Sequence, residues 1–270
     1  MYEQFYGFRQ SPFNITPDPH FLFLSERHRE AFNHLLYGIE ARKGFIQITG
    51  EVGAGKTTLS RALLEKLGPT YKTALILNPI MTGEQLVWLI LAELGLPPSA
   101  RDRMTNIQTL NEYLLEQVPQ GNDVVLLIDE AQNLSMELLE EIRLLSNLET
   151  DQRKLLQIVL MGQPELRQIL DDPRLRQLRQ RITIRYHLAP LSLDETARYI
   201  EHRLHVAGAN SRPVFQRRAI RKVFRYSGGI PRLINAVCDK TLLCGYVVGT
   251  DSLSARHVRR AIRDLEGLDS

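Results

Sequence analysis

Cysteine is scarce in this chain, and long apolar runs are missing. The 270 residues include only Cys238 and Cys244, whose spacing fits no common zinc pattern. Both lie in an apolar stretch, so we expect buried free thiols in a reducing cytosol. No apolar run approaches the ~20 residues of a membrane-spanning helix, and the first residues do not resemble a signal peptide. We therefore expect a cytoplasmic protein that associates with an inner membrane only through partners.

The net charge is also small, at +3, but it is unevenly distributed. Residues 191–270 carry 14 Lys+Arg against 8 Asp+Glu, whereas residues 1–190 carry 20 against 23. A basic C-terminal part suits nucleic acid or another anionic surface, and it is equally compatible with a solvated basic face.

The pattern of apolar runs indicates the fold class. Short apolar runs predict buried strands at residues 44–50, 73–79, 123–130, 155–163 and 182–188. Amphipathic patterns and caps predict helices at residues 25–41, 56–67, 83–94, 107–117 and 136–147, and from 165 onward. Strands that alternate with helices predict an α/β fold, with a parallel five-stranded sheet and helices on both faces.

Three segments are expected along the chain. Residues 1–45 form an arm rich in aromatic residues and proline, followed by a helix, and we expect both to pack on the core. Residues 46–190 form the α/β core. No strand is predicted after Pro190, and helices are expected at residues 192–207, 213–226, 231–245 and 254–265. Residues 191–270 should therefore be a small all-helical lid domain.

A glycine-rich turn follows the first predicted strand. Gly50-Glu-Val-Gly-Ala-Gly-Lys56-Thr57 matches G-x-x-x-x-G-K-[ST] in full, and it lies between a buried strand and a helix. Its backbone N–H groups would point at phosphate oxygens, with Lys56 reaching the β- and γ-phosphates of ATP and Thr57 binding Mg²⁺. The residues expected to contact nucleotide here are Glu51, Val52, Gly53, Ala54, Gly55, Lys56, Thr57 and Thr58.

The third predicted strand ends in an acidic pair. Asp129 and Glu130 follow the apolar run from Val124 to Ile128, which places both carboxylates at the C-terminal edge of the sheet. We expect Asp129 to hold Mg²⁺ through water and Glu130 to polarise the attacking water. A phosphate loop combined with this pair favours an ATPase over a kinase or a GTPase, because no guanine-reading N-K-x-D motif is present.

Polar residues end two further strands. Gln163 follows the fourth strand and could hydrogen-bond the γ-phosphate or the attacking water, or simply be a loop residue. Asn78 ends the second strand and could pair with Glu130, holding it away from the water until a ligand arrives, or belong to a turn.

Arginines supply the remaining candidates. Residues 171–185 contain arginines at positions 174, 176, 179, 181 and 185. These side chains are either solvated or directed at the ATP of a neighbouring subunit, where an arginine stabilises the transition state of phosphoryl transfer. Gly228-Gly-Ile-Pro-Arg232 begins a helix of the C-terminal part, and Arg232 should project towards the nucleotide.

In this order, these parts resemble the AAA+ ATPases. The resemblance implies that Gln163 is the first sensor, Arg232 in G-x-P-R the second sensor, and Arg181 the arginine finger, with Arg179 as the fallback. Arg181 is preferred because Arg-Gln-Arg-Ile precedes the last strand of the core, which is where this superfamily has its arginine finger.

Within that superfamily the chain resembles the ExeA-like, general secretion pathway protein A family. The residues that carry this resemblance are MYEQFYGFRQSPFNITPDPH, GFIQITGEVGAGKTTL, LLIDEAQNL, MGQPEL, LRQRI and GGIPRLIN. It implies an ATP-hydrolysing ring or helical homo-oligomer that serves type II secretion, pilus or exopolysaccharide export, together with membrane or secretion-system proteins. The residues given after the ATPase predict no transmembrane helix and no peptidoglycan-binding domain. We therefore expect the chain to be more similar to the short MshM-type pilus-biogenesis ATPases or to an ATPase that accompanies exosortase and polysaccharide loci, or else to be a truncated form.

A second function stays open at this level. The TniB-like regulators of transposition share much of the same ATPase core, and they bind DNA. Two basic stripes of the C-terminal part favour that alternative, and their arginines are Arg217, Arg218, Arg221 and Arg225 in one stripe and Arg256, Arg259, Arg260 and Arg263 in the other.

Overall fold

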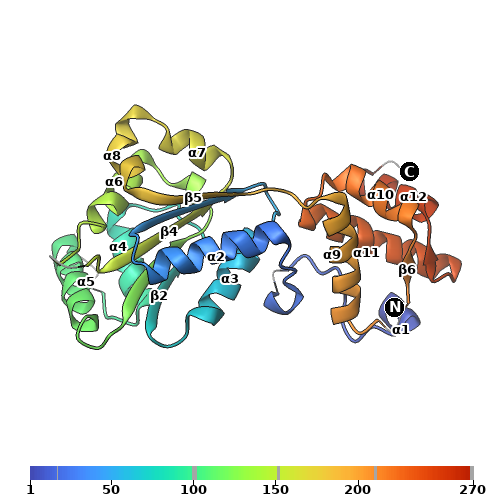
Figure 1. The fold of residues 1–270 in the computed structure, drawn as a ribbon, viewed down its shortest axis with the longest axis horizontal. Helices are drawn as coiled ribbons and strands as arrows, with labels where there is room; N and C mark the ends of the chain where they lie inside the picture. The colour runs from blue at the N-terminus through green and yellow to red at the C-terminus, as the bar shows by residue number, and fades with distance from the viewer. Residues whose placement is uncertain (17, 99–101, 151–152, 210–211, 268–270) are drawn as a thin grey trace. The chain divides into compact units, whose positions relative to one another are not determined.

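The computed structural model describes residues 1–270 except 17, 99–101, 151–152, 210–211 and 268–270 (Figure 1). Pro17 of the N-terminal arm therefore lies outside the described residues. Contacts within the chain divide it into two units. The sheet unit contains residues 29–50 and 59–188, and the helical unit contains residues 1–28, 51–58 and 189–270. The three segments expected from the sequence, with limits at residues 45 and 190, stay a prediction about domain boundaries.

Five parallel strands form the central sheet of the sheet unit. They are β1 (Phe45–Gly50), β2 (Tyr71–Ile76), β3 (Asp123–Ile128), β4 (Leu156–Gly162) and β5 (Ile182–Leu188). Their order across the sheet is β2-β3-β4-β1-β5, and every neighbouring pair is parallel. The predicted α/β fold with a five-stranded parallel sheet is thus confirmed.

Helices cover both faces of this sheet. They are α2 (Glu26–Glu40), α3 (Lys56–Leu67), α4 (Gly83–Glu93), α5 (Arg103–Gln117), α6 (Met136–Leu145), α7 (Glu165–Leu170) and α8 (Arg176–Arg181). Gly38 of α2 lies against Ile46 and Ile184, and a Cβ at Gly38 would be 2.5 Å from Ile46 Cδ1. Alternate strand residues, such as Leu126, pack with α4, α5 and α6 in one buried cluster.

The helical unit contains four longer helices and one small strand pair. The helices are α9 (Leu193–Val206), α10 (Arg217–Ser227), α11 (Pro231–Val248) and α12 (Ala255–Leu265). The strands are β6 (Val214–Phe215) and β7 (Ser252–Leu253), which pair in parallel. The prediction of an all-helical lid, with a helix from residue 213, is corrected here. A two-residue strand is too short for its periodicity to show, and its partner is distant in sequence.

The aromatic arm packs within the helical unit. Its helix α1 (Tyr2–Tyr6) lies against α11, where the Tyr6 hydroxyl donates to the carbonyl of Leu242 at 3.1 Å. Tyr2 hydrogen-bonds Asp239, and burial is the main cause that raises the pKa of the Tyr2 hydroxyl. The rings of Phe13 and Phe21 join the same buried cluster as α9, α10, α11 and α12. The apolar partners of these rings belong to the helical unit, and the packing of residues 1–45 on the α/β core stays a prediction.

The structure also bears on the two cysteines and on membrane-spanning helices. Cys238 and Cys244 are both free thiols. Cys238 is fully buried as expected, whereas Cys244 is only partly buried. Across the described part of the chain, none of the helices has both the length and the apolarity needed to span a bilayer.

Candidate functional site

The phosphate loop joins the end of β1 to the start of α3. Gly53 and Gly55 have φ angles of 78° and 98°, a left-handed backbone that favours glycine. The loop closes on itself through a hydrogen bond from Ala54 N to Glu51 O at 3.0 Å. Lys56 is only 5% exposed, and its ammonium group donates to Glu51 O at 3.0 Å. The loop thus holds its lysine at the turn where the sequence predicts phosphates, while Val52 stays exposed.

Arg232 of α11 lies against this loop. Its backbone N–H donates to Gly53 O at 3.2 Å. A Cβ at Gly53 would be 2.5 Å from Arg232 Cβ, so Gly53 is needed both for its φ angle and for this approach. Arg232 and the loop, which the sequence predicts to share a nucleotide site, are therefore in contact within the helical unit.

His28 also contacts the loop, and sequence reasoning missed it. Its Nε2 lies 3.0 Å from Ala54 O and 3.3 Å from the position of a Cβ at Gly55. Its Nδ1 lies 2.8 Å from Ser25 Oγ, which also accepts a hydrogen bond from the backbone N–H of His28. Because Ala54 O can only accept, Nε2 carries the proton and Nδ1 accepts from the Ser25 hydroxyl. The one available sequence signal was Ser25, the predicted N-cap of α2, whose cap bond the structure contains.

His28 is kept neutral by its surroundings. The side chain is buried, and desolvation is the main cause that lowers its pKa below the ordinary value of 6.5. A neutral imidazole protonated at Nε2 satisfies both contacts, with the Ser25 hydroxyl as the donor to Nδ1.

The acidic pair follows β3 in the sheet unit. Asp129 is 2% exposed, and its Oδ1 accepts from Glu130 N at 2.9 Å. Glu130 has a φ angle of 52°, in the left-handed region that residues other than glycine seldom adopt. Such strain in a residue beside a strand end is frequent at functional sites.

Two glutamines hold the Glu130 carboxylate. Gln132 Nε2 donates to Glu130 Oε2 at 2.6 Å, and Gln163 Nε2 donates to the same oxygen at 3.2 Å. Gln132 also accepts from Gln163 N at 3.0 Å. A Cβ at Gly162 would be 2.9 Å from Gln132 Oε1, so this glycine makes room for the glutamine. Gln163 is therefore placed beside Glu130, and Gln132 is a partner that sequence reasoning missed.

Asn78 was expected to pair with Glu130. It is exposed in the segment that follows β2. Among the described residues, the hydrogen bonds of the Glu130 carboxylate come from Gln132 and Gln163, and none comes from Asn78. The pairing of Asn78 with Glu130 stays a prediction.

The arginines around α8 have partners within the sheet unit. Arg181 Nη1 donates to Ser146 Oγ at 2.6 Å. Arg179 Nη1 lies 3.3 Å from Asp171 Oδ1, and its side chain is 42% exposed. The carboxylates of Asp171 and Asp172 thus offset part of the positive charge that the sequence concentrates here.

Magnesium fits the donors available from the motif. The Thr57 hydroxyl and the Asp129 carboxylate are hard oxygen ligands, which Mg²⁺ prefers. No cluster of three His, Cys, Asp or Glu side chains arranged for a metal occurs among the described residues. In proteins Mg²⁺ usually takes one or two protein oxygens together with phosphates and water.

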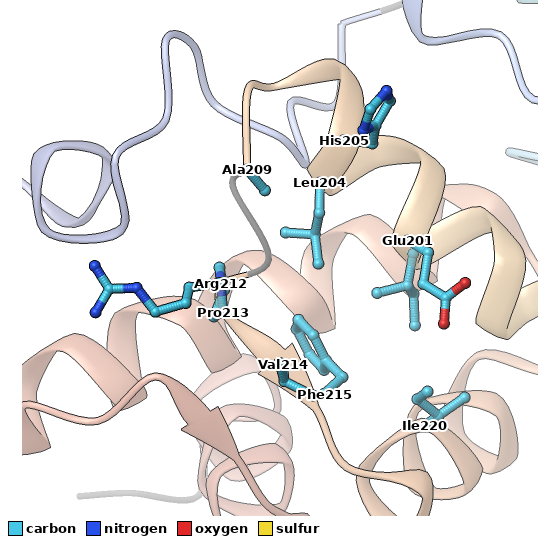
Figure 2. A pocket seen from close by; sticks show the side chains of 10 residues that line it. Glu201, Leu204, His205, Ala209, Arg212, Pro213, Val214, Phe215 and Ile220 are labelled. Atoms are coloured by element: carbon cyan, nitrogen blue, oxygen red, sulfur yellow. The ribbon is translucent and has the colours of Figure 1, made fainter.

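A separate hollow lies within the helical unit, between α9 and the start of α10 (Figure 2). Its volume is about 360 Å³, and its floor is apolar, with Leu204, Phe215 and Ile220. His205 and Arg212 point away from this floor (Figure 2). None of the predicted nucleotide-binding residues lines it.

The strand order, with a phosphate loop after β1 and an acidic pair after β3, is that of the AAA+ class of P-loop proteins. The AAA domain family matches residues 39–170 of the chain. General secretion pathway protein A of Aeromonas hydrophila is 46% identical over 272 residues, covering 99% of this chain and 49% of that protein. The chain is therefore similar to the AAA+ proteins related to general secretion pathway protein A. It spans about half the length of this curated relative.

Solved structures share the fold. The ORC2 protein of Aeropyrum pernix, in its ADPNP–ADP complexes, has a TM-score of 0.71 at 19% identity, with 95% of this chain and 72% of that chain covered. Cdc6p from Pyrobaculum aerophilum has a TM-score of 0.69 at 19% identity, with 92% and 70% covered. The RuvB Holliday junction branch migration motor of Thermotoga maritima has a TM-score of 0.60 at 18% identity, with 90% and 70% covered. At these identities the likeness shows the fold alone.

Proposed function

We propose that this protein binds and hydrolyses ATP. The observation that carries the proposal is the phosphate loop, in which left-handed Gly53 and Gly55 bracket the turn before the buried Lys56. Inward N–H groups at the start of a helix, with a lysine beside them, attract the phosphates of a nucleotide. Arg232, already in contact with Gly53, is available to the same phosphates.

The chemistry of hydrolysis follows from residues at the start of α3 and after the strands β3 and β4. Thr57, together with Asp129 through water, would hold Mg²⁺, which would neutralise charge on the phosphate oxygens. The Glu130 carboxylate accepts a hydrogen bond from the attacking water and orients it. Gln163, which donates to Glu130 at 3.2 Å, is the polar group available to the water or the γ-phosphate. Gln132 fixes the carboxylate through its 2.6 Å hydrogen bond.

Hydrolysis in this scheme depends on assembly. An arginine of a neighbouring copy, Arg181 or Arg179, stabilises the charge of the transition state. The protein then works as a homo-oligomer, a ring or a helical assembly. The kinship with general secretion pathway protein A supports a role in assembling an envelope export system on its cytoplasmic side, with secretion-system proteins as partners.

Two substitutions test the catalytic assignment. Lys56→Ala is expected to abolish ATP binding, measured by titration calorimetry. Glu130→Gln is expected to bind ATP with unchanged affinity and to lose hydrolysis, measured by phosphate release. Glu65→Gln, at an exposed glutamate of α3, is the matched control and should turn over normally. Normal turnover in Glu130→Gln would refute the role of Glu130.

A cellular experiment tests the assignment to export. The Glu130→Gln variant should fail to restore secretion or surface pili in a deletion strain, whereas Glu65→Gln should restore them. Unaffected export in the deletion strain itself would remove the export role while leaving the ATPase assignment intact.

A further inference from the structure

Two helices of the helical unit carry a group of exposed arginines, here called the arginine face. The exposed members of the face are Arg217, Arg218, Arg221 and Arg225 on α10, and Arg256, Arg259, Arg260 and Arg263 on α12. The two helices pack against each other and lie side by side (Figure 1). The arginines of the face are thus carried by two neighbouring helices of the helical unit.

The arginine face lacks carboxylate partners within the described chain. None of its eight arginines lies within ion-pair distance of an acidic group of the described residues. Acidic residues nearby pair elsewhere, Asp251 with Arg212 at 3.6 Å and Asp264 with Lys240 at 2.9 Å. The positive charge of the face is thus available to an anionic partner.

Exposed apolar side chains adjoin this face on α11. Leu243, Val247 and Val248, here called the apolar stripe, are 38%, 65% and 60% exposed. Leu243 and Val247 are three and seven residues after Lys240, so they share its side of the helix.

The ion pair between Lys240 and Asp264 fixes how the stripe lies beside α12. A short connection after Val248 makes α11 and α12 antiparallel neighbours. Leu243 and Val247 follow Lys240 along α11. Arg260 and Arg256 precede Asp264 along α12, so in the antiparallel pair Leu243 lies nearest Arg260 and Val247 nearest Arg256.

The flank of the stripe opposite the arginines is apolar. Phe5 of α1 is 42% exposed, and its ring lies 5.5 Å from that of Tyr246. The stripe is thus bordered by an aromatic ring on one side and by arginines on the other.

We propose that this surface binds the anionic headgroups of a lipid bilayer, with the apolar stripe entering the interface. Arginines would hold the lipid phosphates by paired hydrogen bonds, while the exposed leucine and valines gain free energy on leaving water. A nucleic acid backbone also offers phosphates, but it offers no apolar layer for the stripe. The combination of the two features favours a membrane surface over nucleic acid.

The test measures binding of the full chain to vesicles. Large unilamellar vesicles of phosphatidylcholine with phosphatidylglycerol should pellet the protein, and vesicles of phosphatidylcholine alone should not. Binding should weaken as the salt concentration rises. Because each arginine at an anionic surface contributes about fivefold in affinity, Arg256→Glu with Arg260→Glu should weaken binding at least about 25-fold.

Two further variants separate the apolar stripe from net charge. Lys66→Glu with Arg176→Glu makes the same change in net charge on exposed residues of the sheet unit, and it should bind vesicles like the unchanged protein. Val247→Ser with Val248→Ser keeps every charge and should lower vesicle binding several-fold. Nucleotide binding at wild-type affinity verifies that each variant is folded.

Two results would overturn the proposal. One is equal binding to both kinds of vesicle. The other is tight, salt-sensitive binding to a duplex DNA fragment that Arg256→Glu with Arg260→Glu abolishes, without any effect of Val247→Ser with Val248→Ser on vesicles. That second result would assign the arginine face to nucleic acid.

Discussion

His28 Nε2 lies 3.0 Å from Ala54 O, so the first turn of α2 is hydrogen-bonded to the middle of the phosphate loop. The Ser25 hydroxyl holds the other ring nitrogen at 2.8 Å. The imidazole is therefore held at both ring nitrogens, and it in turn restricts the backbone of the loop at Ala54.

The first prediction is that His28→Ala weakens ATP binding about tenfold, because a lost buried hydrogen bond costs about 1–3 kcal/mol and leaves Ala54 O unpaired. His28→Gln, which keeps an N–H donor, should recover part of this loss. His34→Ala is the matched control on the same helix, since His34 is exposed and lies 4.0 Å from Glu30. Titration calorimetry measures all three variants. Equal affinities for His28→Ala and His34→Ala would contradict the role of His28.

The second prediction concerns the pH dependence of stability. Burial lowers the pKa of His28 below 6.5, so between the two values the unfolded chain binds more protons than the folded chain. The free energy of unfolding should therefore fall as the pH decreases below about 6.5, and His28 should contribute no pH dependence above it.

Urea unfolding at a series of pH values measures this effect. His202 also has a lowered pKa because of burial, so the informative quantity is the difference between the unchanged protein and His28→Gln. The variant should lose less stability between pH 7 and pH 5. Parallel pH profiles for the two proteins would show that His28 does not titrate in this way.

Much of the fold follows from the sequence, because the sheet is built from continuous apolar runs. β3 and β4 are buried along almost their whole length, and such runs read clearly as parallel strands. The strands β6 and β7 were not predicted, because a strand of two residues is too short to show an alternating apolar pattern. The destination of the aromatic arm was also missed, since burial of Tyr6 or Phe13 says nothing about which surface buries it.

The residues of the candidate site are likewise of two kinds, those that the sequence could predict and those that it could not. Lys56, Asp129 and Glu130 belong to local motifs whose spacing carries their chemistry. His28 acts through a contact with Ala54, which is distant in sequence, and Gln132 binds the distant Gln163 N as well as the nearby Glu130. Such contacts leave no local pattern, and only the folded chain brings the residues together.

The third prediction uses two glycines with similar backbones. Gly53 and Gly68 have φ angles of 78° and 73°, so alanine at either costs about 1–2 kcal/mol in backbone strain. A Cβ at Gly68 meets nothing within 4 Å, whereas one at Gly53 would be 2.5 Å from Arg232 Cβ.

Gly53→Ala should therefore displace Arg232 and weaken ATP binding at least about tenfold, an effect of about 1.4 kcal/mol. Gly68→Ala should lower the melting temperature without altering ATP affinity. Thermal unfolding and calorimetry separate the two effects. If both variants bind ATP equally well, the approach of Arg232 to the loop has no bearing on nucleotide binding.

The last prediction decides which arginine acts across the subunit interface. Arg181→Ala should bind ATP normally as a monomer and lose hydrolysis by about 10³–10⁵-fold at saturating ATP, the range that a trans arginine supplies. To reach a neighbouring site, Arg181 must leave Ser146 Oγ, which it contacts at 2.6 Å. Arg179 is paired at 3.3 Å with Asp171, an exposed carboxylate, so it is held less firmly.

Phosphate-release assays on Arg181→Ala and Arg179→Ala, with exposed Arg176→Ala as control, distinguish the two. Normal turnover in Arg181→Ala together with loss in Arg179→Ala would transfer the finger role to Arg179, because the weaker restraint would then be the functional one.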